Sequence, residues 1–359
     1  MDGILVIGAG PAGSASAWKL AENGVPCVLA DRAPFPRSKV CGGVLSGFAC
    51  EILTESGMVS QDEIEDLTLV KRSVMTITAD YRELRTFRGD VPPVRLVNRT
   101  EFDAFLRRRA LEAGAEPVTD SFRGFAGDSA VFSSGREIPF SRMVGADGAS
   151  SRVRRCIPRG RFSRPSPALS TVVHLSEKAM ESLADRGLHI FFFSKFTGYG
   201  WVFPRKDDVI AGIGSFGGPG ASMHDLLGKM LMHAGLGRGS EYRGALLPAG
   251  GQPVHTGSGR VLLAGDAAGL CDRVSGEGIS LALESGMAAA EAILTGTDSW
   301  GKGSRCLRTV RDSSRFRNLL YRRPFRDLAM GALARSDRWY RKYWEIICGK
   351  SDYAALLKG

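Results

Sequence analysis

The segment "GAGPAG", Gly8 to Gly13, constrains the fold of this chain more than any other stretch. It follows the apolar run "GILVI" and precedes "PAGSASAWKLAEN", in which small and apolar residues recur at helical spacing. In such a strand–turn–helix unit, Gly8 allows the tight turn, Gly10 lets the backbone approach a pyrophosphate, and Gly13 packs closely against the strand. Asp31 ends the next strand-like run, "VPCVLAD", where a carboxylate can bind ribose hydroxyls. The pattern predicts a dinucleotide-binding βαβ unit; a purely structural turn is the alternative.

Composition and charge exclude several classes of protein. The chain has 359 residues, of which 43% are hydrophobic and 24% charged, as in a globular protein large enough for two domains. Its seven cysteines are scattered and form no C-x-x-C pair, which argues against a disulfide scaffold or zinc site and for a reducing compartment. The five histidines form no pair with metal-ligand spacing, so we expect no metal. No apolar run reaches the roughly 18 residues that span a bilayer, and the first residues do not resemble a signal peptide, so we expect a cytoplasmic location.

Dinucleotide-type segments alternate along the chain with strand-rich ones. "DLTLVKRSVMTITAD" has strand alternation, "TEFDAFLRRRALEA" predicts a helix with Thr100 as its N-cap, and an Ala-rich helix is expected over 278–294. The predicted fold class is α/β with an α+β substrate part. The predicted parts are a cofactor domain in three pieces (1–65, 96–155 and 255–300), substrate-domain strands (66–95), a substrate-binding sheet domain (156–254) and a basic C-terminal helical region (301–359).

Two later motifs distinguish FAD from NAD. Asp147 begins the DG pair of "VGADGASSRVRR", and Asp266 ends the GD pair of "VLLAGDAAGLCDRVSGEGISLALESG", each after an apolar strand. FAD is long, so it needs a phosphate cradle at one end and a second glycine-rich turn at the other. The set GxGxxG, DG and GD resembles the flavoprotein hydroxylase superfamily. That resemblance implies a p-hydroxybenzoate hydroxylase-like fold, in which a Rossmann-type FAD-binding domain is interleaved with a β-sheet substrate domain.

The resemblance also implies which residues contact FAD. Arg99, in "NRTEFDAFL", matches the R-x-x-F-D arginine that the superfamily places beside the cofactor; a solvated arginine before a helix is the alternative. The GD aspartate, here Asp266, binds ribityl or ribose hydroxyls in that superfamily. The residues expected to contact FAD are Gly8, Gly10, Ala12, Gly13, Asp31, Arg32, Arg37, Cys41, Gly42, Gly43, Arg99, Asp147, Asp266, Gly276, Gly278 and Ile279.

Three stretches resemble, more narrowly, the geranylgeranyl reductase family, over about residues 1–297. They are "FPRSKVCGG", "YGWVFPRKDDVIAGIG" and "SGEGISLALESG". The resemblance implies an FAD-dependent oxidoreductase that uses reduced flavin to saturate carbon–carbon double bonds of isoprenoid or other hydrophobic substrates. The chain departs from the family at Arg273, where proline is usual, so details of the substrate or electron donor can differ.

The implied chemistry selects candidate catalytic residues. Hydride leaves N5 of reduced flavin, and a second group or water gives a proton to the other alkene carbon, which requires a positioned acid and a dry pocket. Cys41 is a candidate proton donor or ring-positioning residue, Tyr199 is the rival acid, and Trp201 lies in the same motif. The alternatives are an inert small side chain at Cys41 and ordinary sheet aromatics on the strand. The substrate pocket is expected to include Tyr199, Trp201, Phe203, Gly212 and Gly214.

Related chemistries remain open because function resides in the site and not in the fold. The Y-x-W-x-F-P strand is similar to the W-x-W-x-I-P strand of flavin-dependent halogenases, which need a catalytic lysine; Lys71 is the candidate, and a solvated sheet lysine is the plainer interpretation. Aromatic monooxygenation and a non-enzymatic redox sensor are further alternatives. The Cys-Gly-Gly loop favours the reductase. NADPH, NADH or ferredoxin is expected as a transient electron donor, because no second dinucleotide-binding domain is expected.

The C-terminal region carries most of the net charge of +10. Residues 304–359 contain 14 Lys and Arg residues against five Asp and Glu, interleaved with aromatic residues. A helical cap over the substrate domain is one interpretation, and peripheral contact with anionic lipid is another that suits a lipid substrate. No nucleic-acid-binding motif is present, so we expect no nucleic acid partner. The sequence leaves the oligomeric state open.

Overall fold

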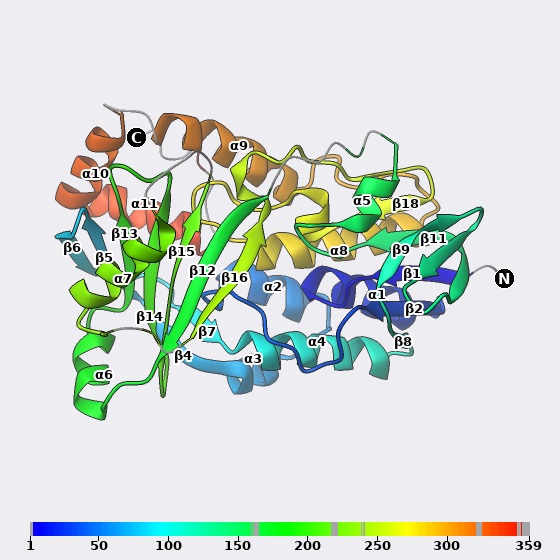
Figure 1. The fold of residues 1–359 in the computed structure, drawn as a ribbon, viewed down its shortest axis with the longest axis horizontal. Coiled ribbons are helices and arrows are strands. Elements are labelled where there is room, and N and C mark those ends of the chain that lie inside the picture. The colour runs from blue at the N-terminus through cyan, green and yellow to red at the C-terminus, as the bar shows by residue number, and fades with distance from the viewer. Residues whose placement is uncertain are drawn as a thin grey trace.

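The computed structural model describes residues 3–158, 160, 165–216, 222–237, 239, 241–320, 325–349 and 353. Within these residues the strands form three sheets, of eight, seven and three strands. Figure 1 shows the eight-stranded sheet and its helices at one end of the long axis and the seven-stranded sheet at the other. The chain passes between the two large sheets several times, so residues far apart in sequence meet where the sheets adjoin.

The eight-stranded sheet has a parallel centre. Its main order is β17-β18-β11-β1-β2-β8, and β9 and β10 extend it as a ribbon beside β11. The neighbours β18, β11, β1, β2 and β8 pair in parallel, as a dinucleotide-binding sheet requires. The strand bounds are β1 Gly3–Ile7, β2 Cys27–Asp31, β8 Glu116–Thr119, β9 Phe122–Ala126, β10 Ser129–Phe132, β11 Glu137–Gly145, β17 Gly257–Ser258 and β18 Val261–Leu263.

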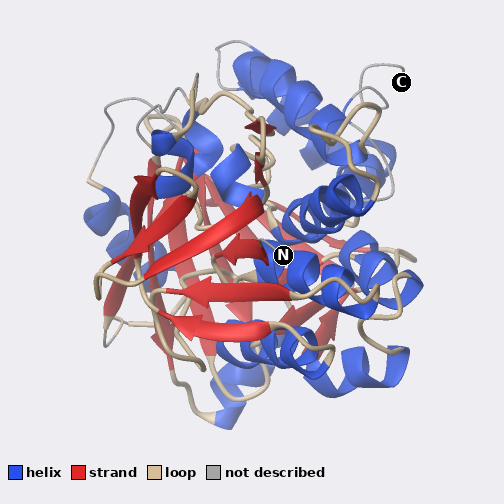
Figure 2. Ribbon diagram, turned by 90° about the vertical axis from the view of Figure 1, so that its right-hand side faces the viewer, coloured by secondary structure: helices blue, strands red, loops and turns tan. Residues whose placement is uncertain are grey.

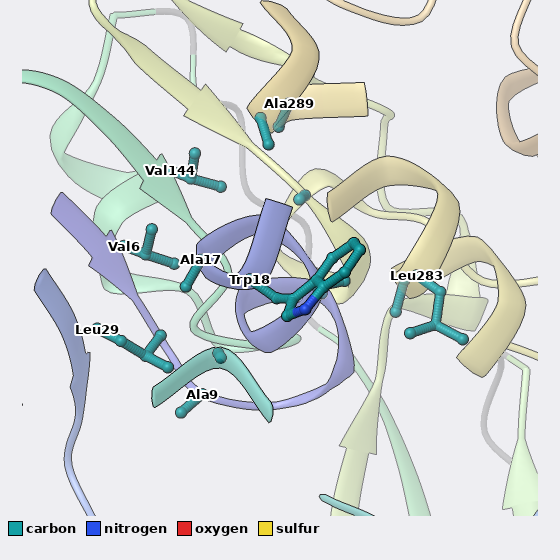
Figure 3. Packing of buried hydrophobic residues seen from close by; sticks show 14 of the residues in the cluster. Val6, Ala9, Ala17, Trp18, Leu29, Val144, Leu283 and Ala289 are labelled. Carbon is teal, nitrogen blue, oxygen red and sulfur yellow. The ribbon is translucent and has the colours of Figure 1, made fainter. Parts of the chain in front are cut away.

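Helices cover this sheet and bury its apolar strands. In Figure 3, Val6 and Leu29 on neighbouring strands lie beside the helix that carries Ala17 and Trp18, and Leu283 lies on the next helix. Helices α1 and α8 touch closely, because a Cβ at Gly286 would lie 2.2 Å from the carbonyl oxygen of Ala12. The helix bounds are α1 Pro11–Glu22, α2 Gly47–Glu55, α3 Gln61–Leu67, α4 Arg99–Glu112, α5 Arg152–Cys156 and α8 Ile279–Leu294, with the 3₁₀ turn η2 at Gly265–Ala268.

The start of α4 differs from the sequence-based expectation. Asn98, not Thr100, is the N-cap, and its side chain accepts a hydrogen bond from the Thr100 backbone N–H at 3.0 Å. The prediction of Thr100 was therefore wrong. Asn and Thr are both favoured at the N-cap, so the sequence pattern alone did not distinguish Asn98 from Thr100. The helix therefore includes Arg99 in its first turn, where its side chain faces the interior.

The seven-stranded sheet runs in the order β16-β12-β15-β14-β13-β5-β6, and its pairings are antiparallel except β13 with β5. Figure 2 shows the strands gathered on one side of the molecule and most helices on the other. A three-stranded sheet, β3-β7-β4, joins the two halves. The strand bounds are β3 Val44–Leu45, β4 Thr68–Arg72, β5 Val74–Ala79, β6 Arg82–Arg88, β7 Val94–Val97, β12 Ser166–Val173, β13 Leu188–Phe192, β14 Gly198–Pro204, β15 Val209–Ser215 and β16 Tyr242–Leu247.

The C-terminal helices pack against the face of this sheet that carries Trp201 and Phe203. Tyr340 stacks on Phe87 with ring centroids 4.2 Å apart, and the Trp344 indole N–H donates to the Pro92 carbonyl at 2.9 Å. Much of the aromatic content of the basic region is therefore core. None of the helices among the described residues is long and apolar enough to cross a bilayer. The remaining bounds are α6 Glu177–Ala184, α7 Met223–His233, η1 Pro248–Gly250, α9 Arg305–Leu320, α10 Phe325–Arg335 and α11 Asp337–Ile347.

Candidate functional site

The turn between β1 and α1 needs its glycines for close backbone contacts. Gly8 has φ +101°, and a Cβ there would lie 2.3 Å from the Ala146 carbonyl oxygen. A Cβ at Gly13 would lie 1.7 Å from the carbonyl oxygen of Gly8. No side chain caps the N-terminus of α1, which begins after Gly10, so its free backbone N–H groups and its dipole favour an anion. The turn therefore has the geometry of a pyrophosphate cradle.

Asp31 holds this turn in place. Its two carboxylate oxygens accept hydrogen bonds from the backbone N–H of Ala9 at 2.7 Å and of Ala33 at 3.0 Å. The Arg37 guanidinium lies 3.8 Å from the same carboxylate and 3.6 Å from where a Cβ on Gly10 would stand. Arg37 thus places a positive charge over the cradle, as a diphosphate requires. The neighbouring Arg32 is exposed after β2.

Arg99 lies inside the molecule, which excludes the alternative of a solvated arginine before a helix. Its side chain forms a two-point ion pair with Asp103, at 2.8 Å through Nε and 3.0 Å through Nη2. Arg37 approaches the same carboxylate at 3.9 Å. Burial lowers the pKa of Arg99, but the charge of Asp103 and the adjacent Cys41 thiol outweigh it, so the pKa is raised overall. Asp103 was missed by sequence reasoning, although it is the aspartate of that same motif.

The two motif aspartates play different parts. Asp147 accepts hydrogen bonds from the Ser151 hydroxyl at 2.5 Å and from the backbone N–H groups of Arg152 and Val153 at 2.6 and 3.1 Å. Those bonds cap α5, so the carboxylate serves the fold directly. Asp147 also lies against Gly8, whose Cβ would come within 2.9 Å of its Cα. We therefore place Asp147 at the wall of the cradle.

Asp266 faces the centre of the site. Its Oδ1 lies 3.7 Å from where a Cβ on Gly278 would stand, so the GD turn and the G-E-G turn meet at this carboxylate. Burial raises the pKa of Asp266, and the positive charges of Lys39, Arg99 and Arg273 oppose that rise. Lys39 comes from the loop before Cys41, which brings three separated segments around one carboxylate. The buried Ile279 opens α8 directly behind the G-E-G turn.

The Cys-Gly-Gly loop packs against β14 of the other sheet. A Cβ on Gly42 would lie 2.8 Å from Cε2 of Phe203 and 3.5 Å from the indole nitrogen of Trp201. Gly43 has φ +75°, and its backbone N–H donates to the Cys41 sulfur at 3.4 Å. The loop with the lone thiol therefore lies between Arg99 on one side and the aromatic strand on the other.

Trp201 and Tyr199 occupy different environments on β14. The indole N–H of Trp201 is buried and has no hydrogen-bond acceptor among the described residues, so it can donate to a bound molecule. The Tyr199 hydroxyl donates to the Ser275 carbonyl, and a Cβ on Gly276 would lie 3.3 Å from that hydroxyl oxygen. Tyr199 therefore holds the G-E-G turn against β14. This contact favours a positioning role for Tyr199 over a role as the proton donor.

The glycines of β15 make room for the Trp201 ring. A Cβ at Gly212 would lie 2.3 Å from Cζ2 of Trp201, and one at Gly214 would lie 3.8 Å from Cζ3. Both are buried beneath the indole. They shape the aromatic wall from behind and are not themselves an open surface.

Two acidic residues at the G-E-G turn, Asp272 and Glu277, were not among the predicted site residues. Asp272, which is 3% exposed, accepts hydrogen bonds from the backbone N–H groups of Val274 and Ser275 and from the Tyr353 hydroxyl, each at 2.8 Å. Glu277 caps α8 through the N–H and hydroxyl of Ser280, both at 2.8 Å, and burial raises its pKa to about 7. The D-x-x-S spacing of Asp272 and Ser275 could have predicted this turn from the local sequence. No feature of the local sequence indicated the contact with Tyr353.

One candidate residue remains, the lysine that a halogenase would need. Lys71 on β4 is half exposed and pairs with Glu65 at 2.7 Å, so it is a solvated sheet lysine. Among the described residues, no group of three or more His, Cys, Asp or Glu side chains is arranged to hold a metal ion.

The residues present fit FAD. The glycine cradle with Arg37 suits a pyrophosphate, the Asp266 carboxylate suits ribityl hydroxyls, and the buried Trp201 N–H offers a donor to an acceptor beside it. The cradle and the GD turn are bridged by α1, because a Cβ at Gly265 would stand 3.0 Å from that of Ala12. One extended cofactor can therefore reach both turns.

Comparison with known proteins agrees with this geometry. The model of the FAD binding domain family matches residues 2–208. The geranylgeranyl diphosphate reductase of Rhodobacter capsulatus is 30% identical over 310 residues, which cover 80% of this chain and 74% of that protein. A geranylgeranyl bacteriochlorophyll reductase-like protein of Thermoplasma acidophilum superposes with a TM-score of 0.70 at 19% identity, over 99% of this chain and 95% of that one.

Structural likeness alone shows only the fold. The halogenase PltM superposes with a TM-score of 0.72 at 18% identity, over 96% of this chain and 80% of that one. The fold class and the superfamily expected from the sequence are thus confirmed, and the narrower assignment comes from the sequence relatives. The chain belongs to the geranylgeranyl reductase family of FAD-dependent oxidoreductases.

Proposed function

We propose that this oxidoreductase reduces carbon–carbon double bonds of a prenyl or other hydrophobic substrate. The carrying observation is the contact between the Cys-Gly-Gly loop and β14, where Gly42 touches both Phe203 and Trp201. That contact joins the FAD-binding half to an apolar aromatic wall. Relatives named for geranylgeranyl diphosphate reduction support the substrate class. Reduced FAD supplies hydride when bound.

The chain's own residues would orient the substrate, exclude water and supply the proton. Trp201 and Phe203, 7% and 6% exposed, exclude water from one side of the loop. Cys41 is the proposed proton donor or ring-positioning residue because its thiol lies beside Arg99 at the end of that wall. Tyr199 holds the opposite turn through Ser275. An alkene has no carbonyl group that the protein could polarise. The reaction therefore depends mainly on how accurately the site positions the proton donor.

The substrate test uses the product mass. The purified flavoprotein is incubated with geranylgeranyl diphosphate and a chemical reductant of flavin, and the product should gain two hydrogen atoms per reduced bond. A product that gains oxygen or halogen would support the monooxygenase or halogenase alternatives instead. No product of any kind, with a flavin that still cycles between redox states, would support a sensor and contradict the proposal.

The catalytic residue test compares two cysteines. Cys41→Ala should retain FAD and fold normally but lose turnover by about 10²-fold or more, as expected for loss of a general acid. Cys156→Ala is the matched control because Cys156 is exposed on α5. Equal turnover in the two variants would remove Cys41 from the mechanism.

The electron donor is also a proposal. The GxGxxG spacing occurs at Gly8–Gly13 and again at 212–217, but Gly212 and Gly214 lie within β15 and not in a turn that opens a helix. With FAD in the first turn, NADPH, NADH or reduced ferredoxin would bind only transiently. Anaerobic flavin bleaching by each donor in turn distinguishes them.

We further propose that α10 contacts the membrane that holds a lipid substrate. Leu328 and Phe325 on this helix are 72% and 48% exposed beside Arg326, whereas Tyr340 and Trp344 of α11 are buried. Leu328→Glu should weaken co-sedimentation with anionic liposomes, and Met232→Glu, which changes a residue 71% exposed on α7, is the matched control. Equal binding by both variants contradicts this contact.

A further inference from the structure

A groove lies beside the turn that carries Arg273, where the family usually has proline. It has a volume of about 490 Å³, within the range of small-molecule sites (roughly 300–1,000 Å³). Its walls come from the loop after η1 and from α9, and Gly276 with its contact to Tyr199 is not part of it. Its polar lining includes Gln252, Arg273, Arg311 and Arg317.

Arg273 is built into the protein by carbonyl groups and not by acids. Its side chain is 2% exposed, and Nη2 donates to the carbonyls of Gln252 at 2.6 Å and Gly269 at 3.0 Å. Its backbone N–H donates to the Ser313 hydroxyl of α9 at 3.1 Å. The Nε and Nη1 groups have no hydrogen-bond partner among the described residues, and no ion pair within them includes Arg273. A fixed guanidinium thus retains two N–H-bearing nitrogens for a ligand.

Gln252 repeats this pattern. It is 2% exposed, and neither its amide nitrogen nor its amide oxygen has a hydrogen-bond partner among the described residues. Buried polar side chains in folded proteins are nearly always paired, so two unpaired groups lining one groove indicate a ligand that pairs them. The amide offers a donor and an acceptor next to the guanidinium of Arg273.

The charge around the groove is positive. Arg317 is anchored through Nη1 to the carbonyls of Phe216 at 2.9 Å and Ala249 at 3.1 Å. Arg311 stands at the exposed edge, where its Nε pairs with Asp312 at 3.1 Å and its other nitrogens are left for a ligand. Burial lowers the pKa of Arg273, and Arg317 lowers it further, while Cys271, Asp272 and Asp266 oppose the change. The positive charges of Arg273 and Arg317 repel one another, and an anion bound between them would relieve that repulsion.

We propose that this groove binds a phosphate ester, with a phosphomonoester or diphosphate group between Arg273, Arg311 and Arg317 and beside Gln252. A phosphate group carries up to two charges and several acceptor oxygens, and the planar guanidinium matches it with paired N–H donors. A monocarboxylate has fewer oxygens and one charge, so it would leave donors unpaired. The proposal does not rest on the reaction proposed above, because it concerns binding at a separate surface of the turn.

The test measures binding of inorganic pyrophosphate to the flavin-loaded protein by calorimetry at low ionic strength. Arg273→Gln should weaken binding about tenfold or more, and Arg311→Glu about threefold or more, since buried charged donors contribute more than exposed ones. Arg308→Glu is the matched control because Arg308 is exposed on the same helix and does not line the groove. Circular dichroism and thermal unfolding establish that each variant is folded.

Two further arms identify the source of the phosphate. Binding of NADP⁺ but not NAD⁺, lost in Arg311→Glu, assigns the groove to a nucleotide phosphate ester. Binding of vesicles containing phosphatidic acid, with the same dependence and none to phosphatidylcholine alone, assigns it to a lipid headgroup. If Arg273→Gln does not fold, the comparison of Arg311→Glu with Arg308→Glu still decides. Equal pyrophosphate affinity in those two variants, whether retained or lost, overturns the proposal.

Discussion

The Gly8–Gly13 turn and the Cys41–Gly43 loop both depend on glycine, but for different reasons. At Gly13 the obstacle to a side chain is the chain's own backbone, the Gly8 carbonyl oxygen at 1.7 Å. At Gly42 the obstacle is the ring of Phe203, 2.8 Å away on a strand of the other sheet. The conformation of the Gly8–Gly13 turn is therefore determined by contacts between residues of the turn itself. The Cys41–Gly43 loop instead packs against Phe203, about 160 positions further along the chain. This long-range contact joins the FAD-binding half of the molecule to the aromatic residues of β14.

The largest effect is expected from a substitution that disrupts the Gly8–Gly13 turn. Gly13→Ala would drive a methyl group into the Gly8 carbonyl, so the backbone must shift, at a cost of about 3 kcal/mol or more. We expect loss of FAD from the purified protein together with lower stability in denaturant unfolding. Gly24→Ala serves as a control for glycine substitution, because a Cβ there meets nothing within 4 Å and only its φ of +72° opposes the change. Full FAD retention in Gly13→Ala would show that the turn is not the cradle.

The G-E-G turn, Gly276 to Gly278, differs from both regions in being held by a titratable group, Glu277. Burial raises the pKa of Glu277 from 4.5 to about 7, so it stays protonated in the folded protein while it ionises in the unfolded chain. The free energy of unfolding contributed by this group therefore falls as pH rises from about 4.5 to 7. Relative to wild type, Glu277→Gln should gain about 1–3 kcal/mol over that interval. A constant difference between the two proteins across it would contradict this assignment.

Gly42→Ala should have a smaller effect than Gly13→Ala because a side chain can move where a backbone cannot. The new methyl group would meet the edge of the Phe203 ring, at a cost of about 1–3 kcal/mol. Phe203→Leu should recover part of this loss in the double variant, as a double-mutant cycle would measure. Since Gly13 meets backbone, no side-chain change should rescue its variant. Strictly additive effects at Gly42 and Phe203 would deny the contact between the two halves.

The smallest effect is expected at Lys71. Its ammonium group is half exposed and pairs with Glu65, and such surface pairs contribute about 0–1 kcal/mol. Lys71→Ala should leave turnover unchanged and alter the free energy of unfolding by less than about 0.5 kcal/mol. A large loss of turnover would revive the halogenase alternative, in which this lysine would act between flavin and substrate.

The same contrast explains which features could be read from the sequence. The β1 strand, the glycine turn, Asp31 and α8 follow from local spacing, and the structure contains each of them. The burial of Arg99 excludes a solvated side chain, and its contact with FAD stays a prediction. Motifs of this kind are legible because backbone geometry within a few residues determines them.

Features that depend on distant partners could not be predicted in this way. Nothing in the local sequence places Lys39 near Asp266, or the Tyr353 hydroxyl on Asp272. The aromatic residues of α11 suggested a membrane surface, but Tyr340 and Trp344 are buried because a sheet happens to lie beneath them. Amphipathic helices bury their apolar face against whichever surface the fold provides, and sequence alone does not identify that surface.

In the proposed function, the Cys41 loop brings bound flavin and a hydrophobic alkene together. The most direct measurement is a single-turnover experiment under anaerobic conditions, in which the reduced flavoprotein is mixed with a polyprenyl alkene and flavin absorbance is followed. We predict that the flavin reoxidises with formation of one saturated bond per flavin, and that Cys41→Ala slows this step without loss of FAD. A flavin that stays reduced in the presence of the alkene, yet reoxidises on admission of oxygen with modification of an aromatic substrate, would contradict the account.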